Sequence, residues 1–185
     1  MEIVQKIGIN KILKALIIIL LGTLLLTLSA KIKIPFYPVP MTMQTFVVLF
    51  MGVVFGWKIG VATISLYLIQ GIIGFPVFSG TPEKGIGLVY FTGPTMGYLI
   101  GFLMAAFLAG YLNPKINNLF INTLMLFISV LPIYVFGIIW LGTLIGWDKP
   151  LFKLGVEPFL LAEFTKIFLL AILYTYFLKK NKRII

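Results

Sequence analysis

The chain has 185 residues, of which 61% are hydrophobic and 11% are charged, and its formal net charge is +10. An ordinary soluble domain has roughly 25% charged residues, so this composition excludes a typical water-soluble fold. The absence of histidine and cysteine from the sequence excludes disulfides, thiol catalysis and imidazole general bases.

Long apolar runs predict helices, because a helix that crosses a bilayer needs about 20 predominantly apolar residues. Two stretches, 85–114 and 116–147, contain no Asp, Glu, Lys or Arg. The first apolar run follows several lysines, as in a signal peptide, but it ends without a convincing small-x-small cleavage site, so we expect a retained helix. In chain order, we expect helices over residues 11–30, 42–56, 58–74, 92–112, 119–145 and 157–178.

The basic residues lie mainly at the ends of these runs, which indicates lipid headgroups as their partner, with no nucleic acid involved. An even number of spans places both termini on one side of the membrane. That side would receive Lys6, Lys11, Lys14, Lys58, Lys115, Lys179, Lys180, Lys182 and Arg183, and the other side Lys31, Lys33, Lys84, Lys149 and Lys153. The positive-inside rule therefore predicts cytoplasmic termini. We expect an all-α membrane protein, a single domain over residues 1–185 that forms a six-transmembrane-helix bundle.

Two connecting loops have an unusual composition. Residues 31–41 contain three prolines together with Phe36 and Tyr37, and residues 75–91 are rich in glycine and proline. With cytoplasmic termini both loops are extracellular. Apolar, aromatic loops are poorly suited to plain water, so we expect them to cap a ligand pocket at the outer end of the bundle.

Glu163 and Lys166 interrupt an otherwise apolar last helix. Their i, i+3 spacing places both side chains on one helix face. A charge at membrane depth is costly, so such residues usually face the bundle interior and mark a function. The alternative is that the two merely pair with each other or snorkel to the outer interface. A buried pair of this kind offers one acceptor and one donor, which suits a neutral urea or amide group.

Other candidates lie near the two loops, and each has a structural alternative. Thr42 can cap the second helix, and Gln44 can line a pocket or bond to another helix. Tyr67 shares a helix face with Gln70, while Phe78 suits either ligand stacking or an interfacial aromatic belt. The remaining candidates are Ser79, Gly80, Thr95 and Tyr98.

Three glycines have expected packing or turn roles. Gly97 and Gly101 form a small-xxx-small pair that favours close helix approach. Gly56, followed by Trp57 and Lys58, predicts a tight hairpin between the second and third helices.

Four ordered motifs together resemble the BioY family of biotin-specific S components of energy-coupling-factor transporters. The run Pro38 to Phe46 is similar to the family's P-V-P-x-T-x-Q-T-F signature, and the last motif, Pro158 to Lys166, to P-F-x-x-x-D-x-x-K. Between them lie the second motif, Tyr67 to Gly80 (Y-L-x-x-G-x-x-G-x-P-V-F-x-G), and the third, Gly93 to Gly101 (G-P-T-x-G-Y-L-x-G). The likeness as a whole extends from about Ile34 to Lys166.

The resemblance implies a multi-pass protein of the cell membrane that binds biotin near its extracellular face. It implies that biotin is delivered through a transmembrane coupling subunit and two cytoplasmic ATPase subunits. It also implies that loop 35–41 acts as a lid and that Glu163 and Lys166 belong to the vitamin site. No cofactor and no metal are expected. Two departures from the family pattern bear on function. Glu163 stands where the family usually has aspartate. The first helix lacks the Ala-xxx-Ala pair with which S components usually dock on the coupling subunit, and its nearest small-residue surface is Gly22 with Ala30.

Substrate capture without chemistry in this chain is the leading hypothesis, and the sequence contains no Walker-type phosphate-binding loop. An S component for another small heterocyclic vitamin is one alternative. A membrane enzyme with Glu163 as general base and Lys166 as electrophile is a second, but no nucleophile or metal cluster supports it. A channel or solo carrier is a third, although the helix over 119–145 is almost devoid of a polar stripe.

Overall fold

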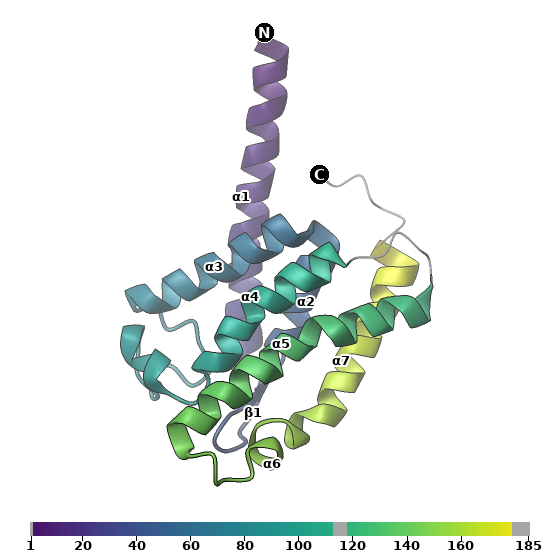
Figure 1. Ribbon diagram of the computed structural model, residues 1–185. Helices are drawn as coiled ribbons and strands as arrows, with labels where there is room; N and C mark the ends of the chain where they lie inside the picture. Colours follow the sequence, from purple (N-terminus) through teal and green to yellow (C-terminus); the bar gives the residue numbers. More distant parts are fainter. Residues whose placement is uncertain (1, 113–117, 179–185) are drawn as a thin grey trace.

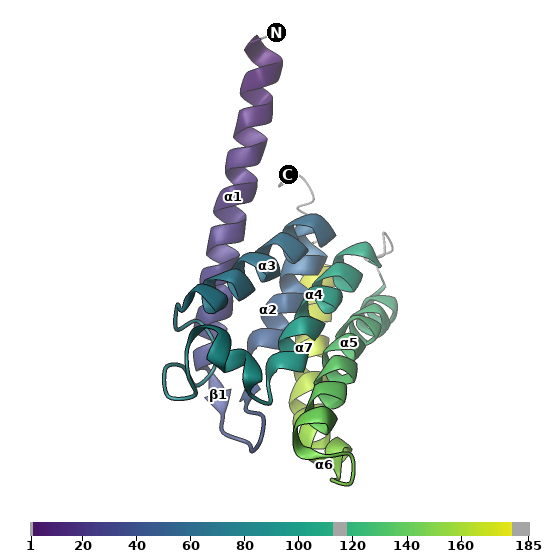
Figure 2. The ribbon, with the colours of Figure 1, turned by 60° about the vertical axis from the view of Figure 1, so that its left-hand side comes forward.

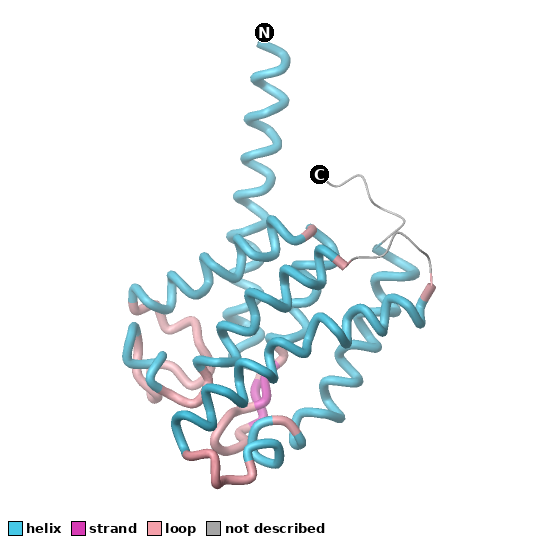
Figure 3. Tube along the Cα trace, in the orientation of Figure 1, coloured by secondary structure: helices cyan, strands magenta, loops and turns pink. Residues whose placement is uncertain are grey.

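The computed structural model describes residues 2–112 and 118–178, with side chains described over 10–112 and 118–176. Helices form most of it, with longer loops after α1 and α3 (Figures 1 and 3). The α-helices are α1 (Glu2–Lys31), α2 (Gln44–Phe55), α3 (Trp57–Ile73), α4 (Met96–Tyr111), α5 (Leu119–Ile145), α6 (Leu151–Gly155) and α7 (Leu160–Ile172). The other elements are the 3-10 helices η1 (Gly87–Thr92) and η2 (Glu157–Phe159), the π-helical η3 (Leu173–Leu178), and the strands β1 (Lys33–Ile34) and β2 (Met41–Thr42).

The six expected helices are all present, with differences at their ends. The first is longer than expected, because α1 begins at Glu2. The last consists of η2, α7 and η3, and η1 precedes α4. Helix α6 and the antiparallel β1–β2 hairpin were not expected. Strands of two residues are too short to give a periodic signal.

Helix α4 is the centre of the bundle. It packs against α2, α3 and α5, while α1 contacts α2 and α3, and α7 contacts α2 and α5. Figure 2 shows α1 extending well beyond the other helices at one end. The first turn of α1 and the last described turn of η3 lie toward that same end, and β1 and α6 lie at the opposite end (Figure 1).

The outer surface is strongly apolar. Leu20 and Leu131 are each 56% exposed and Phe164 is 55% exposed, and many other large apolar side chains of α1, α5 and α7 are exposed as well. Exposed apolar area of this extent indicates a surface that contacts lipid. Two helical stretches of the described part, Asn10–Lys31 and Leu119–Ile145, are long and apolar enough to cross a membrane, and α2, α3 and α4 are shorter apolar helices.

Glycines set the closest helix contacts, as expected. A methyl group at Gly97 would collide with the Phe136 carbonyl oxygen and the Trp140 side chain, and one at Gly101 would collide with the α5 backbone at Ile133. Both glycines therefore allow α4 to lie directly against α5. Gly56 alone connects α2 to α3, at a φ of 82° that disfavours other residues.

The small-residue surface of α1 faces inward. A side chain at Gly22 would meet Thr63 and Met51, and Ala30 is completely buried. The bundle itself therefore covers both residues, and they offer no exposed surface for docking a partner. Of the basic residues used for the topology, Lys115, Lys179, Lys180, Lys182 and Arg183 lie outside the described residues, and the side chain of Lys6 is also undescribed.

Replacing Gly97 with Leu should destabilise the protein by about 1–3 kcal/mol, because the new side chain cannot fit between α4 and α5. Thermal unfolding in detergent measures the effect. Met104→Leu, at a half-exposed position of the same helix, is the matched control and should leave the melting temperature unchanged. A Gly97→Leu protein of normal stability would refute this packing assignment.

Candidate functional site

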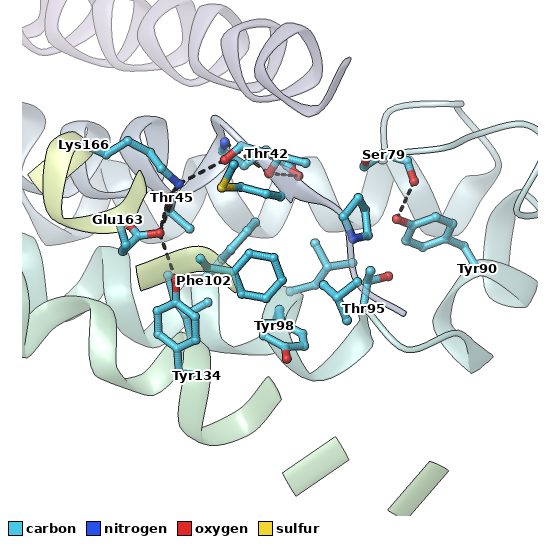
Figure 4. A pocket seen from close by; sticks show the side chains of 17 residues that line it. Thr42, Thr45, Ser79, Tyr90, Thr95, Tyr98, Phe102, Tyr134, Glu163 and Lys166 are labelled. Carbon is cyan, nitrogen blue, oxygen red and sulfur yellow. Dashed lines mark hydrogen bonds and ion pairs between the residues drawn. The ribbon is translucent and has the colours of Figure 1, made fainter. Parts of the chain in front are cut away.

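A cavity lies between the two loops and helices α2, α4, α5 and α7 (Figure 4). The β1–β2 hairpin, whose strand β2 contributes to the wall, lies at the end of the bundle opposite the start of α1 (Figure 1). Its walls combine apolar side chains with a few polar groups. The lining residues are Val39, Pro40, Met41, Thr42, Gln44, Thr45, Ser79, Tyr90, Thr95, Tyr98, Leu99, Phe102, Ile133, Tyr134, Phe159, Glu163 and Lys166. Both loops contribute to the wall, the first through Val39 and Pro40 and the second through Ser79 and Tyr90.

The charged pair lies at one end of the cavity. Glu163 and Lys166 are 4% and 8% exposed, and the Lys166 Nζ lies 3.0 Å from the Glu163 Oε2. The pair forms because positions i and i+3 of α7 share the face that turns toward α2 and α5. The prediction that both residues face the bundle interior is confirmed. They do not snorkel to the interface, but they do pair with each other, as the structural alternative also predicts.

Neighbouring elements satisfy the lysine completely. Its three N–H groups donate to the Thr42 carbonyl oxygen at 3.1 Å, to the Thr45 Oγ1 at 2.8 Å and to the Glu163 Oε2. An ammonium group has three donors and no acceptor. Lys166 therefore has no proton left for a ligand in this arrangement.

The two carboxylate oxygens of Glu163 differ in the number of hydrogen bonds that they accept. Oε2 accepts hydrogen bonds from Thr45 at 3.1 Å, Tyr134 at 3.0 Å and Lys166 at 3.0 Å. Oε1 is buried and has no partner among the described residues. A buried acceptor without a donor costs free energy. Glu163 Oε1 is thus an acceptor that a ligand with an N–H or O–H group can satisfy.

Neutral hydroxyl groups occupy the other end (Figure 4). Ser79 is 4% exposed, and its Oγ has no partner among the described residues. The Tyr90 phenol donates to the Ser79 carbonyl oxygen at 2.8 Å. Burial raises the pKa of the Tyr90 phenol, against a hydrogen bond with Thr95 that lowers it. The phenol therefore stays protonated and holds the Ser79 backbone in place.

Aromatic and aliphatic side chains separate the two polar ends. Phe102, Leu99 and Ile133 come from α4 and α5, and Phe159 packs in stacked orientation on Tyr134 with ring centroids 6.4 Å apart. Tyr98 contributes its ring, while its hydroxyl donates to the Gly155 carbonyl oxygen at 2.9 Å. The middle of the cavity therefore suits an apolar ring system.

Seven predicted site residues line the cavity, and three lie behind its wall. Tyr67 donates to the Val77 carbonyl oxygen at 3.0 Å and accepts from Gln44 at 2.8 Å. Phe78 is stacked on Tyr90 with ring centroids 4.7 Å apart. Gly80 makes a turn at a φ of 79°. These three residues position Gln44 and the loop around Ser79, but they do not line the cavity.

The expected cap at Thr42 takes a different form. Thr42 belongs to β2, and Met43 is the N-cap residue of α2, without a side-chain cap bond. The Thr42 hydroxyl accepts only a long bond of 3.4 Å from the Gln44 N–H. Its carbonyl oxygen, which holds Lys166, is the more important group.

Two residues of the charged cluster, Thr45 and Tyr134, were not among the predicted site residues. Thr45 lies inside the motif Pro38 to Phe46, and Tyr134 is one of the few polar side chains of an apolar helix. Burial of a hydroxyl in such a helix requires a hydrogen-bond partner. This requirement could have marked Tyr134 as a candidate from the sequence, but it does not identify Glu163 as its partner.

Fold and site together are those of a helical membrane protein with an internal cavity that has polar groups at each end. A sequence model of the BioY family matches residues 4–183, and the chain belongs to this family. It is 37% identical over 153 residues to the "Probable biotin transporter BioY" of Pyrococcus horikoshii, covering 83% of this chain and 89% of that protein. It is 33% identical over 168 residues to the "Biotin transporter BioY" of Rhizobium etli, covering 86% of each.

A solved structure has the same fold. The crystal structure of "the S-component for biotin from an ECF-type ABC transporter" superposes with a TM-score of 0.75, at 24% identity, covering 94% of this chain and 93% of that one. At this identity the likeness establishes the architecture.

Lys166→Met should destabilise the ligand-free protein by about 3–5 kcal/mol, because it leaves the Glu163 carboxylate buried without its cation. The double variant Glu163→Gln/Lys166→Met should recover most of that loss, since it removes both charges. Thermal unfolding measures both effects. Lys149→Met is the control, because Lys149 pairs with Asp148 on the surface, where both side chains are more than half exposed. Equal melting temperatures for Lys166→Met and Lys149→Met would contradict the assignment.

Proposed function

We propose that this chain is the substrate-binding subunit of an energy-coupling-factor importer and that it captures biotin from outside the cell. The observation that carries the proposal is the pair of unpartnered atoms in the cavity, Glu163 Oε1 and Ser79 Oγ, with an apolar middle between them. Biotin has a cyclic urea at one end, an apolar sulfur ring, and an aliphatic tail that ends in a carboxylate. The names of the BioY relatives support the same ligand.

The unpartnered atoms favour one orientation of the ligand. Glu163 Oε1 needs a hydrogen-bond donor, and a urea supplies N–H groups, whereas a carboxylate at neutral pH supplies none. A tail carboxylate beside Glu163 would also add a second negative charge to a site where Lys166 is already fully bonded. The urea therefore lies at the Glu163 end and the tail points toward Ser79.

Transport requires partners in this proposal. The chain has no Walker-type phosphate-binding motif, so ATP is hydrolysed by two cytoplasmic subunits that act through a transmembrane coupling subunit. Six membrane-spanning segments with cytoplasmic termini, in the plasma membrane, place the cavity and both loops on the outer side. The excess of basic residues near the termini supports this orientation.

Calorimetric titration of the detergent-purified chain tests the substrate. We expect nanomolar biotin binding at one site per chain, with weak or no binding of thiamine and riboflavin, because neither has a compact cyclic urea with an aliphatic acid tail. Tight binding of thiamine or riboflavin would overturn the proposal, and so would the absence of biotin binding by a folded, monodisperse sample.

Methylation of the urea tests the orientation. Of the two mono-N-methyl derivatives of biotin, at least one should bind about 100-fold more weakly or worse, because Glu163 Oε1 loses its donor. Glu163→Gln should weaken biotin itself by a similar factor. Glu157→Gln, at an exposed position just before α7, is the matched control. Full affinity for both methyl derivatives would place the urea elsewhere.

A further inference from the structure

The two ends of the cavity differ in charge. Both ionised side chains among the described lining residues, Glu163 and Lys166, lie at the same end and compensate each other. The opposite end has the hydroxyl groups of Ser79, Tyr90 and Thr95. A ligand tail that reaches this end therefore meets neutral groups.

Two lysines come near the loop that carries Ser79, but neither lines the cavity. Lys31, at the end of α1, donates to the carbonyl oxygens of Pro76 at 2.9 Å, Phe78 at 3.1 Å and Thr81 at 3.2 Å. Its three N–H groups are therefore committed to the loop backbone. The aliphatic part of Lys84 packs near Gly80, and the residue is exposed. Both lysines shape the loop, and neither is among the residues that line the cavity.

The Ser79 hydroxyl is a positioned donor without an acceptor. The Tyr90 phenol fixes the Ser79 carbonyl, and the stack of Phe78 on Tyr90 fixes the preceding residue. The side chain is buried, and its Oγ has no partner in the described part of the chain. A buried polar atom of this kind is a place where a ligand atom completes the bonding.

A hydroxyl recognises an oxygen acceptor whether or not that oxygen is charged. A cation at this position would attract a carboxylate strongly, because the Coulomb interaction is large at contact in a poorly hydrated site. A serine donates one hydrogen bond to a carboxylate or to an amide carbonyl. Moving a carboxylate out of water costs more than moving an amide, which offsets the stronger bond that the charge makes.

We infer that the Ser79 end of the cavity binds the carbonyl oxygen of the ligand tail as a neutral acceptor, so that the substrate class includes uncharged carboxamides as well as the free acid. The inference rests on the proposed function, since it takes the ring urea to lie at Glu163. The carboxamide keeps the carbonyl acceptor and loses only the negative charge. The chain thus selects its ligand by the ring and tolerates a change of charge at the tail.

The test compares biotin with biotinamide, its primary amide, by calorimetry on the purified full chain at neutral pH. We expect dissociation constants that agree within tenfold. A preference for the acid of more than tenfold would overturn the inference while leaving the proposed function intact. Failure of both ligands to bind would instead reject the proposed function, so the two failures are distinguishable.

Ser79→Ala tests the residue assignment. It should weaken biotin and biotinamide by a similar factor of about 5- to 20-fold, because each loses one buried hydrogen bond. The variant removes only an unpartnered hydroxyl, so its thermal stability should not fall. Thr92→Ala is the matched control, since the Thr92 hydroxyl is exposed and bonds to Val89 of its own helix. Unchanged affinity for both ligands, or a loss confined to the acid, would overturn the assignment.

Discussion

One buried ion pair determines how this bundle is organised around its cavity. Taking a carboxylate and an ammonium out of water is costly, and their attraction compensates only when further hydrogen bonds satisfy both groups. Here the compensation comes from three other elements. Thr45 of α2 and Tyr134 of α5 bond to Glu163, and the Thr42 carbonyl of β2 bonds to Lys166. The pair on α7 therefore ties two helices and the first loop to one place, in a region where the surrounding side chains are apolar.

These hydrogen bonds still leave two buried polar atoms of the cavity without a partner, which a ligand can supply. Three donors converge on one oxygen of Glu163 and none of the described residues serves the other, while at the far end Ser79 has a donor without an acceptor. A ligand with an N–H group at one end and an oxygen at the other would satisfy both atoms at once. The apolar wall between them, with Phe102 and Ile133, adds affinity for a ring but little selectivity for charge. Selectivity therefore comes from the ring N–H that Glu163 Oε1 requires, while Ser79 Oγ requires an oxygen acceptor that can be charged or neutral.

The sequence predicts much of this arrangement where a local rule applies. Hydrophobic runs located the helices, the i, i+3 spacing located the charged pair on one face, and Gly97 with Gly101 marked the closest helix contact. Contacts between residues far apart in the sequence could not be predicted in this way, because they depend on how the helices pack. Tyr67 and Phe78 were predicted to touch the ligand, but the fold places them behind the wall, because the loop after α3 turns back over its own helix. Tyr134 reaches Glu163 across 29 positions of sequence, and no spacing rule relates two residues that far apart.

The proposed binding mode depends most on the two buried atoms that lack a protein partner, Glu163 Oε1 and Ser79 Oγ, and a crystal structure of the chain with bound biotin tests it directly. It should place a urea nitrogen within hydrogen-bonding distance of Glu163 Oε1 and a tail oxygen at Ser79 Oγ, with the Glu163–Lys166 pair intact. A structure in which the tail carboxylate contacts Lys166, or in which Glu163 Oε1 remains without a donor, would contradict the account.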